Sequence, residues 1–164
     1  DVPTRWVRCT RYDPASVPQR FDKTEPVPDE PVVTDNVTSI MWQGCAAGLS
    51  GSGCNLNAPV LLFYADAMNY CNNLDWGGYT DWRLPDIKKL YSIVDPRQFW
   101  PAIDTMVFSN TPGSESSCGM FWSATEDASD SNMAYVVPFH SLNVISEDKD
   151  STTEDLYTRC ARSL

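Results

Sequence analysis

Hydrophobic and polar residues alternate along the C-terminal part of the chain. In residues 132–139 (NMAYVVPF), alternation places Met133, Tyr135, Val137 and Phe139 on one face of a predicted strand. The next segment, SLNVIS, is predicted to pair with this strand as a hairpin through His140 and Ser141. Further strand-like segments lie at residues 3–11, 37–43, 119–126 and 155–163.

Two segments in the middle of the chain have helical spacing instead. The first is predicted to follow Pro59 and to end at Gly77 and Gly78. Its inner face consists of Tyr64, Ala67, Cys71 and Leu74. The second is predicted to begin at Pro85–Asp86, with Asp86 as the N-cap. Its apolar stripe consists of Ile87, Leu90, Tyr91 and Val94.

The two remaining segments lack a regular period. Residues 13–31 contain five prolines, which predicts an extended, irregular segment on the surface. Residues 95–118 predict a long loop, and long loops in compact domains are often functional. The order of elements predicts an α+β fold, with two helices packed on antiparallel sheets. We divide the chain into an N-terminal strand and Pro-rich segment, 1–33, and a main domain, 34–164.

The net charge of the chain limits the classes of partner that we expect. The net charge of −10 argues against nucleic acid and anionic membranes as partners, because the field of the protein repels both. We find neither a signal peptide nor an apolar run long enough to enter a membrane, so membrane insertion is not expected. Arginines gather at the two ends of the chain, which would form a small basic region if the ends meet: Arg5, Arg8, Arg11, Arg159 and Arg162.

Six cysteines without a C-x-x-C pair, together with a single histidine, disfavour a structural zinc site. They favour disulfides and an oxidising compartment over buried free thiols. Cys45 and Cys54 bracket a Gly/Ser-rich loop and are natural partners by proximity.

The sequences WVRCTR (6–11) and YTRCAR (157–162) resemble each other. Chance, two neighbouring terminal strands and the end of a preceding similar domain all remain open as explanations.

Catalytic motifs are not apparent. The sequence has no Gly-x-Ser-x-Gly, His-Glu-x-x-His or phosphate-binding loop, and His140 falls in an expected turn. Acidic pairs such as Glu126–Asp127 could serve a glycosidase, but solvated turns explain them more simply. No cofactor is expected, although calcium at the acidic segments stays open as an alternative.

Aromatic residues divide into two predicted groups. Trp42, Trp82 and Trp122 are expected to be buried, whereas Trp100 in the long loop is expected to contact a ligand. The turn between the two helices contains Asp81, Trp82, Arg83 and Pro85, and we interpret it as structural rather than reactive.

Several motifs then occur in an order that resembles a known family. The stretch AMNYCNNLDWGGYTDWRLPDIKKLYSIVD, followed by FWSATE, AYVVPF and TRCAR, is similar to the Lcl C-terminal domain family of bacterial surface proteins. The resemblance covers roughly residues 34–162. It implies a fold related to C-type lectins and formylglycine-generating enzymes, stapled by disulfides. It also implies a Cys71–Cys160 disulfide and, with it, Cys9–Cys118.

The catalytic residues and calcium motifs of those relatives have no counterpart in this chain, so we expect a protein without enzymatic activity. The resemblance implies a secreted or surface-displayed domain that binds a glycan or a surface protein. A structural or self-associating module is the alternative, and a carboxylate-based glycan hydrolase is a weaker one. The expected ligand-facing residues are Arg97, Trp100, Asn110, Glu115, Glu126 and Asp127.

Overall fold

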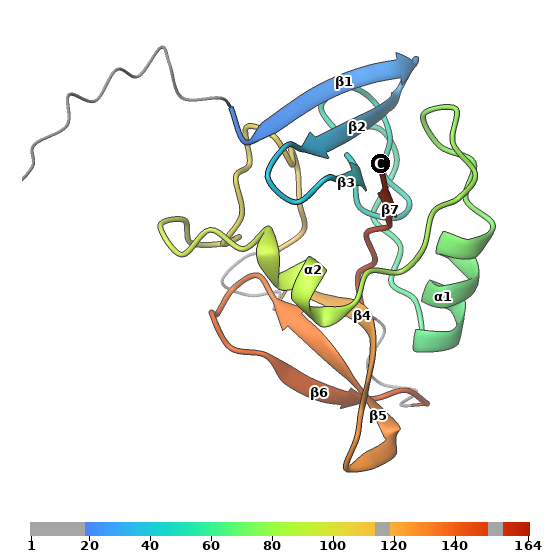
Figure 1. The fold of residues 1–164 in the computed structure, drawn as a ribbon, viewed down its shortest axis with the longest axis vertical. Helices are drawn as coiled ribbons and strands as arrows, with labels where there is room; N and C mark the ends of the chain where they lie inside the picture. The colour runs from blue at the N-terminus through green and yellow to red at the C-terminus, as the bar shows by residue number, and fades with distance from the viewer. Residues whose placement is uncertain (1–18, 114–118, 151–155) are drawn as a thin grey trace, which may run out of the picture.

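A computed structural model of the chain describes residues 19–113, 119–150 and 156–164. Two antiparallel sheets and two short helices, α1 (Tyr64–Asn72) and α2 (Ile87–Ser92), form the fold (Figure 1). The first sheet has the order β1 (Phe21–Val27), β2 (Glu30–Asp35), β3 (Ile40–Gln43) and β7 (Ala161–Ser163). The second contains β4 (Met120–Asp127), β5 (Asp130–Pro138) and β6 (Ile145–Asp148). The predicted α+β class is confirmed.

The Pro-rich segment departs from its prediction. Instead of an irregular stretch, most of residues 21–35 form the β1–β2 hairpin at one edge of the first sheet. Pro26 is tolerated because β1 is an edge strand and because the pairing register shifts between Thr24 and Val27. The expected domain boundary after residue 33 therefore falls inside β2. The strand predicted at residues 3–11 lies outside the described residues.

The helices are shorter than predicted. Helix α1 begins at Tyr64 rather than after Pro59, and it ends at Asn72, before Gly77 and Gly78. Its buried residues, Ala67 and Cys71, belong to the predicted inner face. Helix α2 begins as predicted, because the Asp86 carboxylate accepts a hydrogen bond from the Lys89 backbone N–H at 2.9 Å. Its predicted apolar stripe is only partly right: Leu90 is buried, but Tyr91 is exposed and Val94 lies beyond the end of the helix.

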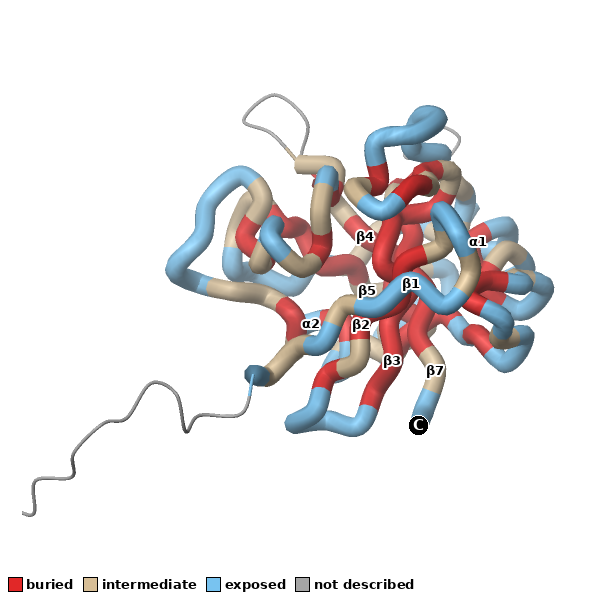
Figure 2. Tube along the Cα trace, turned by 90° about the horizontal axis from the view of Figure 1, so that it is seen from above, coloured by how far each residue is buried: buried red, intermediate tan, exposed pale blue. Residues whose placement is uncertain are grey.

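The core lies between the sheets and the helices, where the buried segments gather (Figure 2). Trp42, Trp82 and Trp122 are all buried, as predicted. The predicted inner face of β5 is only partly right. Val137 and Phe139 are buried as predicted, but Met133 and Tyr135 are only half-buried. Ala134 and Val136, which the alternation placed on the opposite face, are fully buried.

Strand β6 pairs with β5 as expected, although it begins at Ile145 and a connection broader than a two-residue turn precedes it. Two disulfides lie within the described residues. Cys45–Cys54 closes a short loop, and Cys71–Cys160 joins α1 to the residue before β7. Both were predicted and both are confirmed. The third predicted pair, Cys9–Cys118, lies outside the described residues.

Candidate functional site

The turn between the helices is organised around Trp82. Its side chain is fully buried, and its indole N–H donates to the carbonyls of Trp76 and Tyr79 at 3.1 and 2.9 Å. Gly77 precedes these contacts with φ of +62°, and a Cβ there would lie 2.6 Å from a Val32 methyl group. The turn therefore has both a buried anchor and a position that only glycine fits.

The neighbouring charged residues tie this turn to β7. Asp81 accepts two hydrogen bonds from Arg162, at 2.6 and 3.1 Å, and these hold the pKa of its carboxyl below the ordinary value. Arg83 exchanges backbone hydrogen bonds with Ala161 at 2.9 Å in both directions. The Arg83 guanidinium is exposed and donates to the Trp82 carbonyl.

The long loop after α2 is anchored from beneath by Arg159. This guanidinium is completely buried; its Nη1 donates to the Gln43 and Gly44 carbonyls, and its Nη2 donates to the Thr111 hydroxyl at 2.8 Å. It also lies over the Phe108 ring at 5.0 Å. Burial lowers the pKa of Arg159 to about 9. This burial was not predicted, because the sequence pattern placed Arg159 in a basic region at the chain ends.

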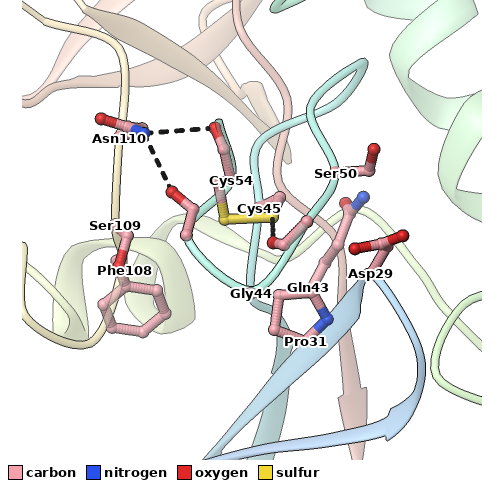
Figure 3. The surroundings of a disulfide bond; sticks show 12 residues. Asp29, Pro31, Gln43, Gly44, Cys45, Ser50, Cys54, Phe108, Ser109 and Asn110 are labelled. Carbon is pink, nitrogen blue, oxygen red and sulfur yellow. Dashed lines mark hydrogen bonds between the residues drawn. A yellow bond between two sulfur atoms is a disulfide. The ribbon is translucent and has the colours of Figure 1, made fainter. Parts of the chain in front are cut away.

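A second anchor joins the long loop to the Cys45–Cys54 loop (Figure 3). The Asn110 side-chain amide donates to the carbonyls of Gly53 and Cys54, at 2.9 and 3.4 Å. Asn110 was a candidate ligand residue. In the structure its amide nitrogen instead links the long loop to the Cys45–Cys54 loop.

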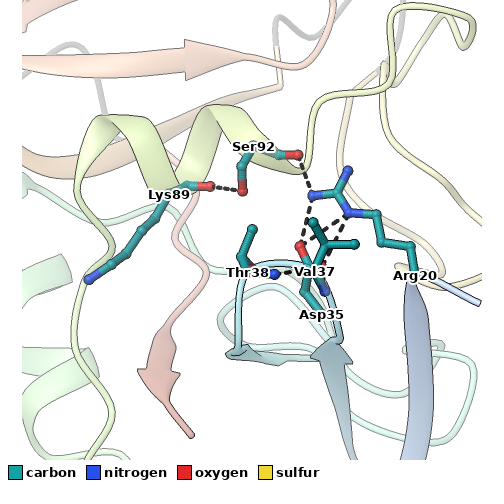
Figure 4. Close-up of polar contacts among 6 residues, drawn as sticks. All are labelled: Arg20, Asp35, Val37, Thr38, Lys89 and Ser92. Atoms are coloured by element: carbon teal, nitrogen blue, oxygen red, sulfur yellow. Dashed lines mark hydrogen bonds and ion pairs between the residues drawn. The ribbon is translucent and has the colours of Figure 1, made fainter.

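The start of the loop is fixed by an ion pair that the sequence did not suggest (Figure 4). Arg20 donates to the buried Asp35 carboxylate at 2.7 Å and to the Ser92 carbonyl at the end of α2 at 2.8 Å. Burial of the Asp35 carboxyl raises its pKa, but hydrogen bonds from Arg20, Val37 and Thr38 outweigh this effect. The pKa of Asp35 is therefore below its ordinary value.

Between these anchors the loop exposes its aromatic residues. The side chains of Phe99 and Trp100 are 73% and 45% exposed. The Trp100 ring stacks on His140 with 6.0 Å between ring centroids, and the Tyr91 hydroxyl donates to the Leu142 carbonyl at 3.0 Å. We name these residues the aromatic loop surface: Tyr91, Phe99, Trp100, His140 and Leu142.

The backbone supports this arrangement. The Ala102 N–H donates to the Phe139 carbonyl at 2.5 Å, which fixes the loop against the end of β5. Trp100 has φ of +59°, a region that bulky side chains rarely adopt. Such conformations gather at binding sites, where surrounding contacts hold them in place.

Beside this surface lies a hollow of about 330 Å³ whose lining includes Phe21, Val94, Asp95, Arg97 and Asp104. Arg97 is 87% exposed in its side chain and donates to Asp95 at 3.0 and 3.1 Å. These hydrogen bonds hold the pKa of Asp95 below its ordinary value. The loop thus combines exposed rings with a carboxylate–guanidinium pair, both suited to polar ligands that have a flat apolar face.

Glu126 and Asp127 lie elsewhere, at the far end of the β4–β5 hairpin (Figure 1). Glu126 pairs with Lys149 at 3.0 Å, and Asp127 accepts from the Ser129 backbone and hydroxyl at 2.8 and 2.7 Å. The structure does not bring them together with Arg97 and Trp100. Glu115 falls outside the described residues.

Side chains that could bind a metal ion are not grouped in the part of the chain that the structure describes. In residues 19–113, 119–150 and 156–164, no three His, Cys, Asp or Glu side chains are grouped to hold a metal ion. Part of the acidic segment considered for calcium, residues 151–155, lies outside these ranges.

These features define a disulfide-linked α+β domain that presents candidate binding groups on a well-anchored loop. The family model of the Lcl C-terminal domain matches residues 31–162, which is most of the chain. The protein therefore belongs to the Lcl C-terminal domain family, as the motifs predicted. A comparison with curated proteins gave no match.

Membership of this family indicates a surface-associated domain. Its two disulfides fit an oxidising, extracytoplasmic setting. No helix in the part of the chain that the structure describes is long and apolar enough to cross a membrane.

Proposed function

We propose that this chain is a non-catalytic extracellular binding domain that recognises a glycan or a surface protein through the aromatic loop surface. The observation that carries the proposal is the exposure of Phe99 and Trp100 on a loop whose two ends are firmly anchored. Single exposed apolar side chains are common on protein surfaces, but exposed rings gathered in one place are typical of an interaction surface.

The anchors matter for affinity. A loop that is already ordered loses little conformational entropy when it binds, so more of the contact energy appears as affinity. Arg20 and Asp35 fix the beginning of the loop, whereas Arg159 and Asn110 fix its end. The exposed rings therefore form a prepared platform for a sugar face or a protein side chain.

The direct test is a broad glycan and surface-protein array, probed with and without calcium. We expect binding by the wild-type domain, with a loss of at least tenfold in Trp100→Ala. Val37→Ala is the control, because Val37 is 74% exposed in the β2–β3 turn and is not part of the aromatic loop surface; its contact with the Asp35 anchor is through its backbone N–H, which the substitution keeps. No binding on either array, or equal binding by Trp100→Ala, would reject the proposal.

A second candidate function, self-association, is favoured by a different surface. The loop before α1 exposes four large apolar residues: Leu56, Val60, Leu61 and Phe63. A patch of this kind suits contact with another copy of the chain. Light scattering of the wild type and Leu61→Glu would test it; an oligomer lost in the variant supports self-association, and a wild-type monomer rejects it.

A further inference from the structure

A pocket of about 210 Å³ lies where the Asp81–Pro85 turn and α2 meet the outer edge of β7. Its walls include the apolar side chains of Ile40, Leu84 and Pro85. Its charged residues are Asp81, Arg83, Lys89 and Arg162. Helix α2 contributes Lys89 here and Tyr91 to the aromatic loop surface, but the two sites share no residue, so the pocket is a separate feature.

The cations of the pocket differ in how far they are neutralised. Arg162 is paired with Asp81 at 2.6 Å and lies over the Tyr79 ring at 4.2 Å. Lys89 lies 3.3 Å from Asp86. Among the described residues Arg83 forms no ion pair: its exposed guanidinium donates to the Trp82 carbonyl, and its charge helps to lower the pKa of Asp81, which Arg162 already pairs.

Three cations and one carboxylate, Asp81, line the pocket, and Lys89 also pairs with Asp86 just outside it. Counting both carboxylates, one positive charge is in excess, and Arg83 is the cation without an ion pair. This excess stands out on a chain whose net charge is −10.

The edge of β7 adds a backbone donor. The Gln43 N–H donates to the Cys160 carbonyl, and the Leu164 N–H donates to the Ser39 carbonyl. The Cys160 carbonyl and the Leu164 N–H therefore face β3 and the turn before it. Because backbone groups alternate along a strand, those of Ala161 and Ser163 face the opposite way. Ala161 pairs with Arg83 there, which leaves the Ser163 N–H directed toward the pocket that it lines.

We propose that this pocket binds a single carboxylate carried by a ring-sized molecule, an acidic sugar such as a uronic acid. The planar Arg83 guanidinium suits bidentate contact with a carboxylate, and the Lys89 ammonium and Ser163 N–H supply further donors. Ile40, Leu84 and Pro85 offer an apolar floor for the C–H face of the ring.

The net charge of the pocket favours a ligand with a single negative charge. One excess positive charge matches one carboxylate, whereas the strongly acidic body of the protein repels a polyanion such as a sulfated chain. The size of the pocket favours one ring over an extended peptide. A peptide added to the edge of β7 would find only the backbone of Ser163 unpaired, too few ladder bonds to hold it.

The test is an NMR titration of the ¹⁵N-labelled domain with glucuronate and, in parallel, with its uncharged methyl ester. We expect saturable shifts at Arg83, Lys89 and Ser163 with glucuronate, and binding at least tenfold weaker with the ester. Arg83→Gln should weaken glucuronate binding about tenfold or more. Lys88→Gln, an exposed neighbour that does not line the pocket, removes the same charge and should bind as the wild type does.

Four outcomes would overturn the proposal: no saturable shifts, equal binding of the ester, shifts centred elsewhere, or unchanged glucuronate affinity in Arg83→Gln. Tighter binding of a free peptide carboxylate or of a sulfated disaccharide would also reject an acidic sugar as the ligand. Equal urea unfolding midpoints for the three proteins establish that differences arise at the pocket rather than from unfolding.

Discussion

The turn 77–86 and the long loop 95–113 use the same types of residue in opposite ways. Each contains a tryptophan, an arginine and an aspartate within a few positions. In the turn, Trp82 is fully buried, with its N–H bonded to two carbonyls; in the long loop, Trp100 is about half exposed and stacks on His140. Composition alone therefore does not decide which cluster supports the fold and which meets a partner.

The difference arises from how each segment is held. The turn is fixed by its own side chains, which pack beneath it and bond to the adjacent β7. The long loop is fixed mainly from outside, by Arg20 at its start and by Arg159 beneath its end. Because the anchors are separate from the tip, Phe99 and Trp100 are left available on the surface.

The two disulfides provide the largest expected contrast. Cys71–Cys160, which lies beside the residues that hold the turn, spans 89 residues of sequence, whereas Cys45–Cys54 spans 9. Chain entropy predicts that replacing both cysteines of the long-range pair by serine lowers the free energy of unfolding by about 4 to 5 kcal/mol. The same change to the short-range pair should lower it by about 2.5 kcal/mol. Urea unfolding under non-reducing conditions measures both, and the reverse order would contradict the account.

The two tryptophans give the next contrast. Trp82→Ala should lower the free energy of unfolding by about 3 to 5 kcal/mol, because it leaves a cavity and removes the indole donor. Trp100→Ala should change it by less than about 1 kcal/mol, because the ring is largely a surface group. Chemical denaturation of both variants checks this. An equal loss in the two would mean that Trp100 supports the fold rather than a binding surface.

The ion pairs of the two regions, Arg20–Asp35 and Asp81–Arg162, can be compared by their contribution to stability at low pH. Asp35 and Asp81 both have pKa values below the ordinary one, so each stabilises the fold above the unfolded pKa, near pH 4, and this stabilisation is lost as pH falls below it. At pH 7, Asp35→Asn should cost about 2 kcal/mol, because the carboxylate is buried. Asp81→Asn should cost less than about 1 kcal/mol, because water screens its exposed pair.

Unfolding midpoints between pH 3 and pH 7 test these values. The difference between Asp35→Asn and the wild type should shrink toward pH 3. A difference that stays constant over this range would show that the Asp35 charge does not contribute.

The last prediction concerns Asn110, whose expected effect is smaller than that of Asp35. Asn110→Ala removes the amide that bridges to Gly53 and Cys54, and should cost about 1 kcal/mol. Asn110→Gly is the matched control for the backbone, since Asn110 has φ of +48° and glycine accepts that conformation. Hydrogen exchange should quicken in the Cys45–Cys54 loop of both variants. Unchanged exchange in both would show that the bridge does not order this loop.

Local signals in the sequence predicted the elements that depend on neighbouring residues. Asp86 caps α2 because its own turn presents the Lys89 N–H, and the helix could be read from this pattern. The same holds for Trp82, whose hydrogen-bond partners lie within six residues. The motif FWSATE also placed β4 correctly, whereas the strand predicted at residues 155–163 is present among the described residues only as β7, Ala161–Ser163.

Features that depend on distant residues could not be predicted. Strand β1 was missed because Pro26 argued against it, and only its place at the sheet edge makes the proline acceptable. The burial of Arg159 depends on Gln43 and Thr111, far away in sequence. The candidate residues Glu126 and Asp127 were grouped with the long loop although the fold separates them (Figure 1).

The central claim is that the exposed tryptophan of the long loop binds a partner, whereas the buried Trp82 of the turn supports the fold. The most direct measurement is the dissociation constant of the strongest array ligand for the wild type, for the Phe99→Ala/Trp100→Ala double variant and for Val37→Ala. We predict a weakening of at least tenfold in the double variant only, with an unfolding midpoint close to that of the wild type. An unchanged dissociation constant in the double variant would contradict the account.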